Sequence, residues 1–136
     1  MHENQLGTLI LKAAYRVHSE LGPGLFESVY EAVLAHEIQN QGIEVQRQPA
    51  IPIFYRNLRF EEGFRADLIV ERKVILELKS VENLDRVHAK KLLTQLRLSG
   101  IHLGYLINFG EAQLKFGIKR VVNGLSGAPT PLRSPA

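Results

Sequence analysis

Two apolar, alternating segments separated by three residues constrain the fold of this chain more than any other feature. Residues 64–70 and 74–80 read as the two strands of a hairpin, because side chains alternate between the two faces of a strand. In one register each apolar residue faces an apolar partner: Val70 opposite Val74, Leu68 opposite Leu76, and Ala66 opposite Leu78. A shift of one residue would destroy this match, so we expect the register to be fixed.

The same register places two carboxylates directly opposite each other. Asp67 in the first strand faces Glu77 in the second, and Lys79 follows two residues later on the same face. Directly opposed residues have Cβ atoms roughly 4.5–5.5 Å apart, and like charges at that separation are destabilising. A positive partner is therefore expected, either Lys79 or a divalent metal ion bound by the hard carboxylate oxygens.

The composition indicates one globular domain without cysteine. A chain of 136 residues can build a single hydrophobic core, and 45% hydrophobic with 23% charged residues is ordinary for a soluble domain. The absence of cysteine excludes disulfides and thiolate metal sites and favours a reducing, cytoplasmic setting. No apolar run approaches the ~20 residues that span a bilayer, so no membrane contact is expected. The net charge of +3 permits a polyanionic partner without requiring one.

The remaining pattern predicts the α/β class, a single domain in which a mixed β-sheet is flanked by helices. The predicted helices span residues 5–20, 26–40 and 86–99, and further strands are expected within 43–60, 103–108 and 114–122. The domain is expected to cover residues 1–123. Residues 124–136, rich in Gly, Pro and Ser, are expected to form a disordered tail.

The second predicted helix carries a glutamate at the edge of its apolar stripe. The stripe consists of Phe26, Val29, Tyr30, Val33, Leu34 and Ile38. At about 100° per residue, Glu27 falls at the edge of the stripe and Glu31 just beyond it. Glu27 could stabilise the first turn of the helix from the surface through the helix dipole. Alternatively, the helix could pack over the sheet edge with Asp67 and Glu77, where three carboxylates would need a cation.

The third predicted helix places basic and amide side chains beside its apolar arc. Lys91 and Gln95 flank the arc on one side, and Lys90 and Arg97 flank it on the other. These side chains could hold the phosphates of a nucleic acid, which would make binding sensitive to salt. They could equally form the solvated face of the helix, since no helix-turn-helix, zinc or RNA-binding signature accompanies them.

Three short motifs together resemble a known family. Residues 24–30, Gly-Leu-Phe-Glu-Ser-Val-Tyr, match the G-x-x-E-x-x-Y signature that names a family of small bacterial proteins. Residues 65–68, Arg-Ala-Asp-Leu, with residues 77–79, Glu-Leu-Lys, resemble the core of the PD-(D/E)xK nuclease superfamily, to which that family is assigned. Residues 104–110, Gly-Tyr-Leu-Ile-Asn-Phe-Gly, are similar to the family's closing strand, G-L-L-I-N-F-G. The resemblance extends from about residue 6 to residue 122.

The resemblance implies a restriction-endonuclease-like core with its active site at the edge of a mixed sheet. By the superfamily's pattern, Asp67 and Glu77 would bind Mg²⁺ or Mn²⁺, aided by the backbone carbonyl of Leu78. Lys79 would position or help deprotonate the attacking water and stabilise charge that develops on the phosphate. Glu27 would correspond to the acidic residue on the preceding helix that completes the site in many members.

Two departures from the superfamily's pattern stand out. Ala66 stands where a proline usually precedes the first aspartate, and Lys91 and Gln95 stand where a Gln-x-x-x-Tyr pair is expected. If that pair orients the catalytic lysine or the DNA backbone in relatives, its replacement bears on activity. Tyr30 matches the family signature, but its place one turn after Glu27 favours a core aromatic over a catalyst.

The sequence thus predicts a metal-dependent phosphodiesterase that acts on DNA or RNA. A magnesium ion held by carboxylates lowers the pKa of bound water and polarises the phosphoryl oxygen, as hydrolysis requires. One alternative is a catalytically inactive nucleic-acid-binding module that retains the fold, which the departure at Lys91 and Gln95 favours. Another is a protein-interaction subunit that joins a homodimer or a partner protein.

Overall fold

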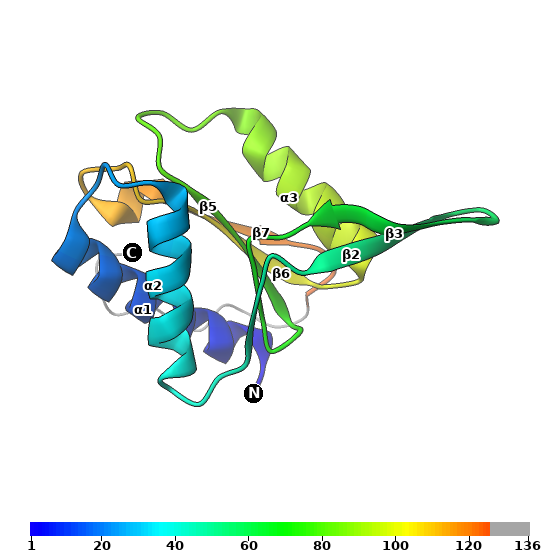
Figure 1. Ribbon diagram of the computed structural model, residues 1–136, viewed down its shortest axis with the longest axis horizontal. Coiled ribbons are helices and arrows are strands. Elements are labelled where there is room, and N and C mark those ends of the chain that lie inside the picture. The colour runs from blue at the N-terminus through cyan, green and yellow to red at the C-terminus, as the bar shows by residue number, and fades with distance from the viewer. Residues whose placement is uncertain (126–136) are drawn as a thin grey trace.

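The computed structural model describes residues 1–125 and contains a five-stranded sheet and a separate two-stranded sheet (Figure 1). In chain order the elements are α1 (Glu3–Leu21), α2 (Glu27–Gln39), β1 (Val45–Arg47), β2 (Ala50–Tyr55), β3 (Leu58–Arg65), β4 (Leu68–Val70), β5 (Val74–Lys79), α3 (Arg86–Ser99), β6 (Leu103–Asn108), the short 3-10 helix η1 (Leu114–Gly117) and β7 (Ile118–Val122). The predicted tail, residues 124–136, lies outside the described residues from position 126 onward.

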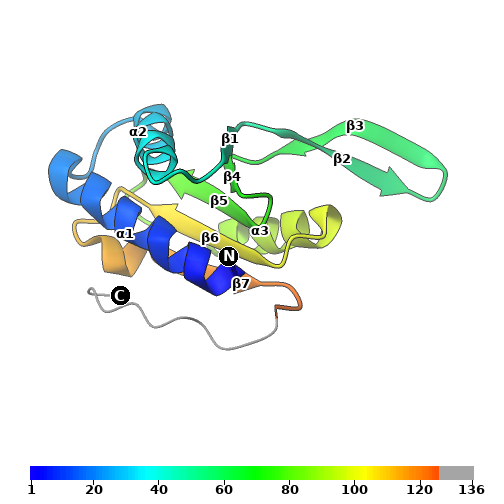
Figure 2. The same ribbon diagram turned by 90° about the horizontal axis from the view of Figure 1, so that it is seen from below.

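The five-stranded sheet is mixed and is covered by helices on both faces. Its strand order is β1-β4-β5-β6-β7, in which β5 and β6 run parallel and the other neighbours run antiparallel. Helices α1 and α2 pack on one face and α3 packs on the other (Figure 2). This arrangement confirms the predicted α/β class with a mixed sheet flanked by helices. No helix within residues 1–125 is long and apolar enough to cross a bilayer.

The two faces of strand β5 belong to two different apolar cores. Leu76 and Leu78 join the larger core under α1 and α2, whereas Ile75 joins the smaller core under α3. Because β5 runs without a register shift, alternation puts Glu77 and Lys79 on the same face as Ile75. The burial of leucines on one side thus directs the polar residues of this strand toward α3.

The predicted hairpin register is confirmed where β4 pairs with β5, but the predicted continuous first strand is wrong. Residues 66–67 belong to no strand, and the preceding residues Phe64 and Arg65 pair with β2 instead. The alternation of side chains restarts after this break. Ala66 therefore packs in the α3 core and not, as predicted, on the face that carries Leu68.

The predicted third helix is found with the same bounds, and the last predicted strand is shorter than expected. The Asp85 side chain accepts a hydrogen bond from the Val87 N–H at 3.0 Å and so caps the start of α3. Gly100 ends the helix with a left-handed φ of 74°. The predicted strand over 114–122 is wrong in its first half, where the chain forms η1 before β7 begins at Ile118.

Strands β2 and β3 form an arm that projects from the body of the protein (Figure 1). They pair in antiparallel fashion with an irregularity between Ile51 and Ile53. The outer part of the arm carries four large apolar side chains that are each more than half exposed: Phe54, Tyr55, Leu58 and Phe60. We refer to residues 50–65 as the arm and to the five-stranded sheet with its helices as the body.

Candidate functional site

The carboxylates of Asp67 and Glu77 form a pair at the break between β3 and β4, close enough for the charge of Asp67 to raise the pKa of Glu77. Asp67 Oδ2 accepts a hydrogen bond from the backbone N–H of Leu78 at 2.8 Å. The backbone N–H of Asp67 in turn faces the Glu77 carboxylate and lowers its pKa. The backbone pairing of β4 with β5 ends at Leu68. Beyond this position the side chains of Asp67 and Glu77 take the place of backbone partners, so residues 66–67 leave the sheet.

The pair is partly withdrawn from water, and this raises the pKa of both carboxyl groups. The pKa of Glu77 is raised to about 7, mainly by burial and also by the charge of Asp67, whereas Lys79 opposes the shift. Burial is also the main cause that raises the pKa of Asp67. Because the two groups are difficult to ionise together, a cation bound between them would stabilise their charged forms.

Glu31 connects helix α2 to this carboxylate pair, although its position in the sequence predicted no role for it. Its side chain is buried, accepts a hydrogen bond from Gln48 Nε2 at 2.6 Å and meets Arg47 at 3.3 Å. Gln48 Nε2 also lies 3.2 Å from Asp67 Oδ1, and Gln48 adopts a left-handed φ of 52°, which is uncommon for a residue other than glycine. The spacing of Glu27 and Glu31, one helical turn apart, is the signal that could have identified this residue.

Glu27 is exposed at the start of α2, and its charge reaches the carboxylate pair. It raises the pKa of both Asp67 and Glu77. The predicted apolar stripe is wrong at Phe26, which is 82% exposed, because Phe26 precedes the helix with an extended backbone and lies outside the helical repeat. Among residues 1–125, no three His, Asp or Glu side chains form a group that could hold a metal ion.

The loop that presents Glu27 is held by Tyr30 and Ser80. The Tyr30 hydroxyl accepts a hydrogen bond from the Leu25 N–H at 3.2 Å and donates to a carbonyl earlier in the same loop. The Ser80 hydroxyl donates to the Leu25 carbonyl at 2.6 Å. Tyr30 is fully buried and stacks on Phe109 with ring centroids 4.5 Å apart, which confirms that it is a core aromatic.

The end of strand β6 fixes the segment that follows Lys79. Asn108 is fully buried, accepts a hydrogen bond from the Val81 N–H at 3.0 Å and donates to the Val81 carbonyl at 2.9 Å. A Cβ atom at Gly110 would lie 2.2 Å from the Val81 carbonyl oxygen, so this close approach requires glycine. The three motifs are thus in physical contact around one end of the sheet.

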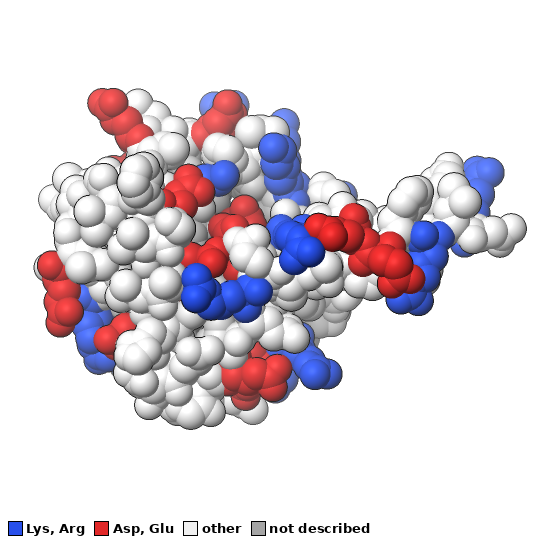
Figure 3. Space-filling view, in the orientation of Figure 1, with Lys and Arg blue, Asp and Glu red and all other residues white. Residues whose placement is uncertain are grey.

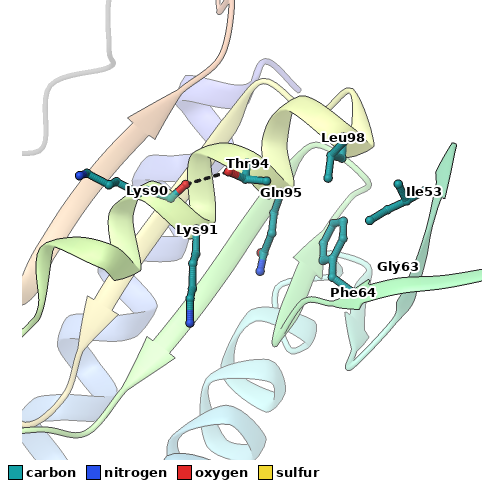
Figure 4. A pocket seen from close by; sticks show the side chains of 8 residues that line it. All are labelled: Ile53, Gly63, Phe64, Lys90, Lys91, Thr94, Gln95 and Leu98. Carbon is teal, nitrogen blue, oxygen red and sulfur yellow. Dashed lines mark hydrogen bonds between the residues drawn. The ribbon is translucent and has the colours of Figure 1, made fainter. Parts of the chain in front are cut away.

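The predicted nucleic-acid contacts on α3 divide into two groups. Lys90, Lys91 and Gln95 line a cavity of about 350 Å³ between α3 and the root of the arm, whereas Arg97 is exposed and does not line it. Figure 4 shows the side chains of Lys91 and Gln95 pointing toward the sheet. The Lys90 side chain points away, while its carbonyl accepts a hydrogen bond from the Thr94 hydroxyl at 3.2 Å.

Acidic side chains gather between α2 and α3 on the face seen in Figure 3, and basic side chains lie on either side of them. This mixture suits a ligand that carries both a bound cation and phosphate groups, because each charge on the ligand then finds its opposite.

The family model of the PD-(D/E)XK nuclease superfamily matches residues 4–121. The chain belongs to this superfamily. The match extends from the first turn of α1 to β7 and so includes every element that builds the site. No curated protein and no solved structure matches the chain in the corresponding comparisons.

The donor chemistry of the site fits the divalent metal that PD-(D/E)XK nucleases typically use. Asp67 and Glu77 offer hard carboxylate oxygens, which Mg²⁺ and Mn²⁺ prefer. Burial and like charge raise the pKa of both groups, and a nearby dication would reverse that effect. Lys79 adds an ammonium group on the same face of β5 as Glu77.

Proposed function

We propose that this protein is a metal-dependent nuclease that hydrolyses phosphodiester bonds of DNA or RNA. The juxtaposed carboxylates of Asp67 and Glu77, with the raised pKa of both groups and with Asp67 held by the Leu78 N–H, carry the proposal in a member of this superfamily. Residues 24–30 support a narrower assignment to the family named for the G-x-x-E-x-x-Y signature. The absence of cysteine supports a cytoplasmic setting.

In the proposed mechanism, Asp67, Glu77 and the backbone carbonyl of Leu78 would hold Mg²⁺ or Mn²⁺. The metal, when bound, would lower the pKa of a water molecule and neutralise charge on the scissile phosphate. Lys79 would hold a phosphate oxygen and position the attacking water from the same face of the strand. Glu27 would supply a further carboxylate from α2 at the exposed side of the site.

Glu31 acts as a positioning residue in this mechanism and touches no reacting atom. Its bonds to Gln48 and Arg47 fix the loop between β1 and β2, and Gln48 in turn holds one oxygen of Asp67. The other oxygen of Asp67 is held by a backbone N–H. Asp67 is therefore restrained at both oxygens before any ligand arrives, and such preorganisation lowers the cost of reaching the reactive geometry.

The proposal is tested by incubating the purified chain with single- and double-stranded DNA and RNA in Mg²⁺ or Mn²⁺. We expect metal-dependent cleavage that falls by at least about 10²-fold in Glu77→Gln, which removes a metal ligand, and in Lys79→Met, which removes the positive charge at the scissile phosphate. Glu82→Gln, an exposed change shortly after β5, is the matched control and should retain full activity. Cleavage that survives Glu77→Gln would contradict the proposal.

A catalytically inactive nucleic-acid-binding module is the second candidate. It is favoured by Lys91 and Gln95, which replace the Gln-x-x-x-Tyr pair expected on α3. Salt-sensitive binding by the unaltered protein, with no turnover in either metal, would support the module and exclude the nuclease.

A further inference from the structure

The cavity between α3 and the arm root has no role in the proposed hydrolysis, and one of its walls, Phe64, stands three residues before Asp67. Its volume of about 350 Å³ falls at the lower end of the range for small-molecule sites, roughly 300–1,000 Å³. Ile53 and Phe64 of the arm and Leu98 of α3 supply its apolar walls. Phe64 precedes Asp67 by three residues, so their Cα atoms are at most about 11 Å apart.

Gln95 lines this cavity and has one side-chain atom that lacks a hydrogen-bond partner within residues 1–125. Its Oε1 atom is buried and has no hydrogen-bond partner among the described residues. A buried polar atom without a partner is destabilising and calls for an explanation. Phe64 and Leu98 carry no polar side-chain atom, and the hydroxyl of Thr94, which also lines the cavity, donates to the Lys90 carbonyl instead. Because this atom is itself inaccessible, a ligand in the cavity would satisfy it once the Gln95 carboxamide turns toward the ligand.

We propose that this cavity binds one nucleobase of the polynucleotide, beside the phosphate that lies at the carboxylate pair. The inference rests on the proposed function and specifies how its substrate is held. A nucleobase has flat apolar faces and a polar edge, and the cavity combines apolar walls with the Gln95 carboxamide and the polar side chains of α3. Phe64 and Leu98 contact the faces of the base, as aromatic and apolar side chains do in single-strand binding sites. The Gln95 carboxamide pairs with the edge, and it can donate and accept at once.

Lys91 supplies the charge that would hold the adjoining phosphate. It precedes Gln95 by one helical turn, about 6 Å along the axis, and in Figure 4 it points from α3 toward β5. A base that is stacked and paired in a duplex cannot reach a cavity between a helix and a strand. The substrate is therefore single-stranded, or unstacked at this nucleotide.

Gly63 allows the arm to form the cavity wall. A Cβ atom at this position would lie 2.0 Å from Cγ1 and 2.7 Å from Cβ of Ile53, so the Ile53 side chain occupies that space. Gly63→Ala would displace Ile53 from the wall while leaving every charge and every polar group of the site in place.

The experiment measures the affinity of the protein for fluorescein-labelled 12-nucleotide strands of dA, dC and dT in EDTA, where cleavage plays no part. We expect one base to be preferred by at least about fivefold, which is the lower end of discrimination by a paired amide. Gln95→Met keeps the size of the side chain and removes its hydrogen bonds, so it should abolish the preference. Gln39→Met, the same change at an exposed position of α2, should leave the preference intact.

The outcomes of these measurements distinguish the nucleobase cavity from the proposed nuclease activity. Equal affinities for the three strands, or a preference that survives Gln95→Met, would overturn the nucleobase cavity. Gly63→Ala provides a second variant, and it should weaken binding of the preferred strand more than binding of the others. Cleavage in Mg²⁺ without base preference would refute only the cavity, whereas base-selective binding without cleavage would refute only the nuclease. Equal binding of the duplex and the single strand would also overturn the cavity.

Discussion

The body and the arm both contain strands rich in apolar residues, but only the body covers them. Ile75 and Leu76 of β5 are fully buried on opposite faces of the five-stranded sheet, each beneath a helix. In the arm, Phe54 is 61% exposed and Phe60 is 52% exposed. A two-stranded hairpin is marginally stable by itself. The apolar residues of the body therefore specify the fold, whereas those of the outer arm are available for contacts with another molecule.

The largest effect is expected from a truncation in the body. Leu76→Ala removes a fully buried side chain from the core under α1 and α2. We expect the free energy of unfolding to fall by about 2–5 kcal/mol, because the deletion leaves a cavity in a close-packed region. Urea denaturation followed by circular dichroism measures this loss. A fall below about 1 kcal/mol would contradict the picture of a tightly packed body.

The carboxylate pair should make the metal-free protein less stable as the pH rises toward neutrality. Burial raises the pKa of Glu77 from 4.5 to about 7, so folding takes up a proton between these values. The stabilisation is complete below pH 4.5 and is lost as the pH rises through 7, a change of roughly 3 kcal/mol. Thermal melts in EDTA from pH 4.5 to 8 would show this fall in stability, added to the effect of any other group that titrates in the same interval.

The Glu77→Gln variant provides the control for this trend, because it cannot ionise at residue 77. Its melting temperature should depend less on pH than that of the unaltered protein over this interval, and Mg²⁺ should stabilise it less. Glu82→Gln removes an exposed carboxylate and should leave both dependences unchanged. An identical pH dependence in Glu77→Gln would show that Glu77 does not titrate as described.

A smaller effect is expected where the body holds the loop before α2. Tyr30→Phe keeps the ring that stacks on Phe109 and removes the hydroxyl that bonds the loop at Leu25. We expect a loss of about 1–2 kcal/mol in the free energy of unfolding. Tyr55→Phe, the same change on the exposed arm, is the matched control and should have no measurable effect. Equal losses in the two variants would remove the distinction between body and arm.

The smallest effect is expected at the outer arm. Phe54→Ser should change the free energy of unfolding by no more than about 0.5 kcal/mol, because the side chain is mostly exposed. The measurement should be repeated at several protein concentrations. A large, concentration-dependent loss would show that the arm is buried against a second copy of the chain.

The sequence predicted best those features that neighbouring residues determine. Helix α3 was predicted to the residue, because Gly100 ends it locally through a left-handed turn. The register of β4 and β5 was also predictable, since a single pairing matches their apolar residues. The break at Asp67 was not, because it depends on a side chain that bonds the backbone of Leu78 in another strand.

The burial of Glu31 was beyond sequence reasoning for a similar reason. A carboxylate just beyond an apolar stripe is buried only if partners arrive from elsewhere, and here Arg47 and Gln48 come from the far end of β1. The cavity beside the site also escaped prediction, because Phe64 and Gln95 approach each other only after α3 packs on the sheet. Local periodicity does not encode which distant segments of the chain come together.

The arm is tied to the body by two short connections, residues 48–49 and residues 66–67. Gln48 stands in the first and Asp67 in the second, and the two are hydrogen-bonded to each other. Both connections of the arm thus contain a residue of the candidate site. Any reorientation of the arm relative to the body would have to change the backbone at Gln48 or Asp67, and so would alter the position of the Asp67 carboxylate.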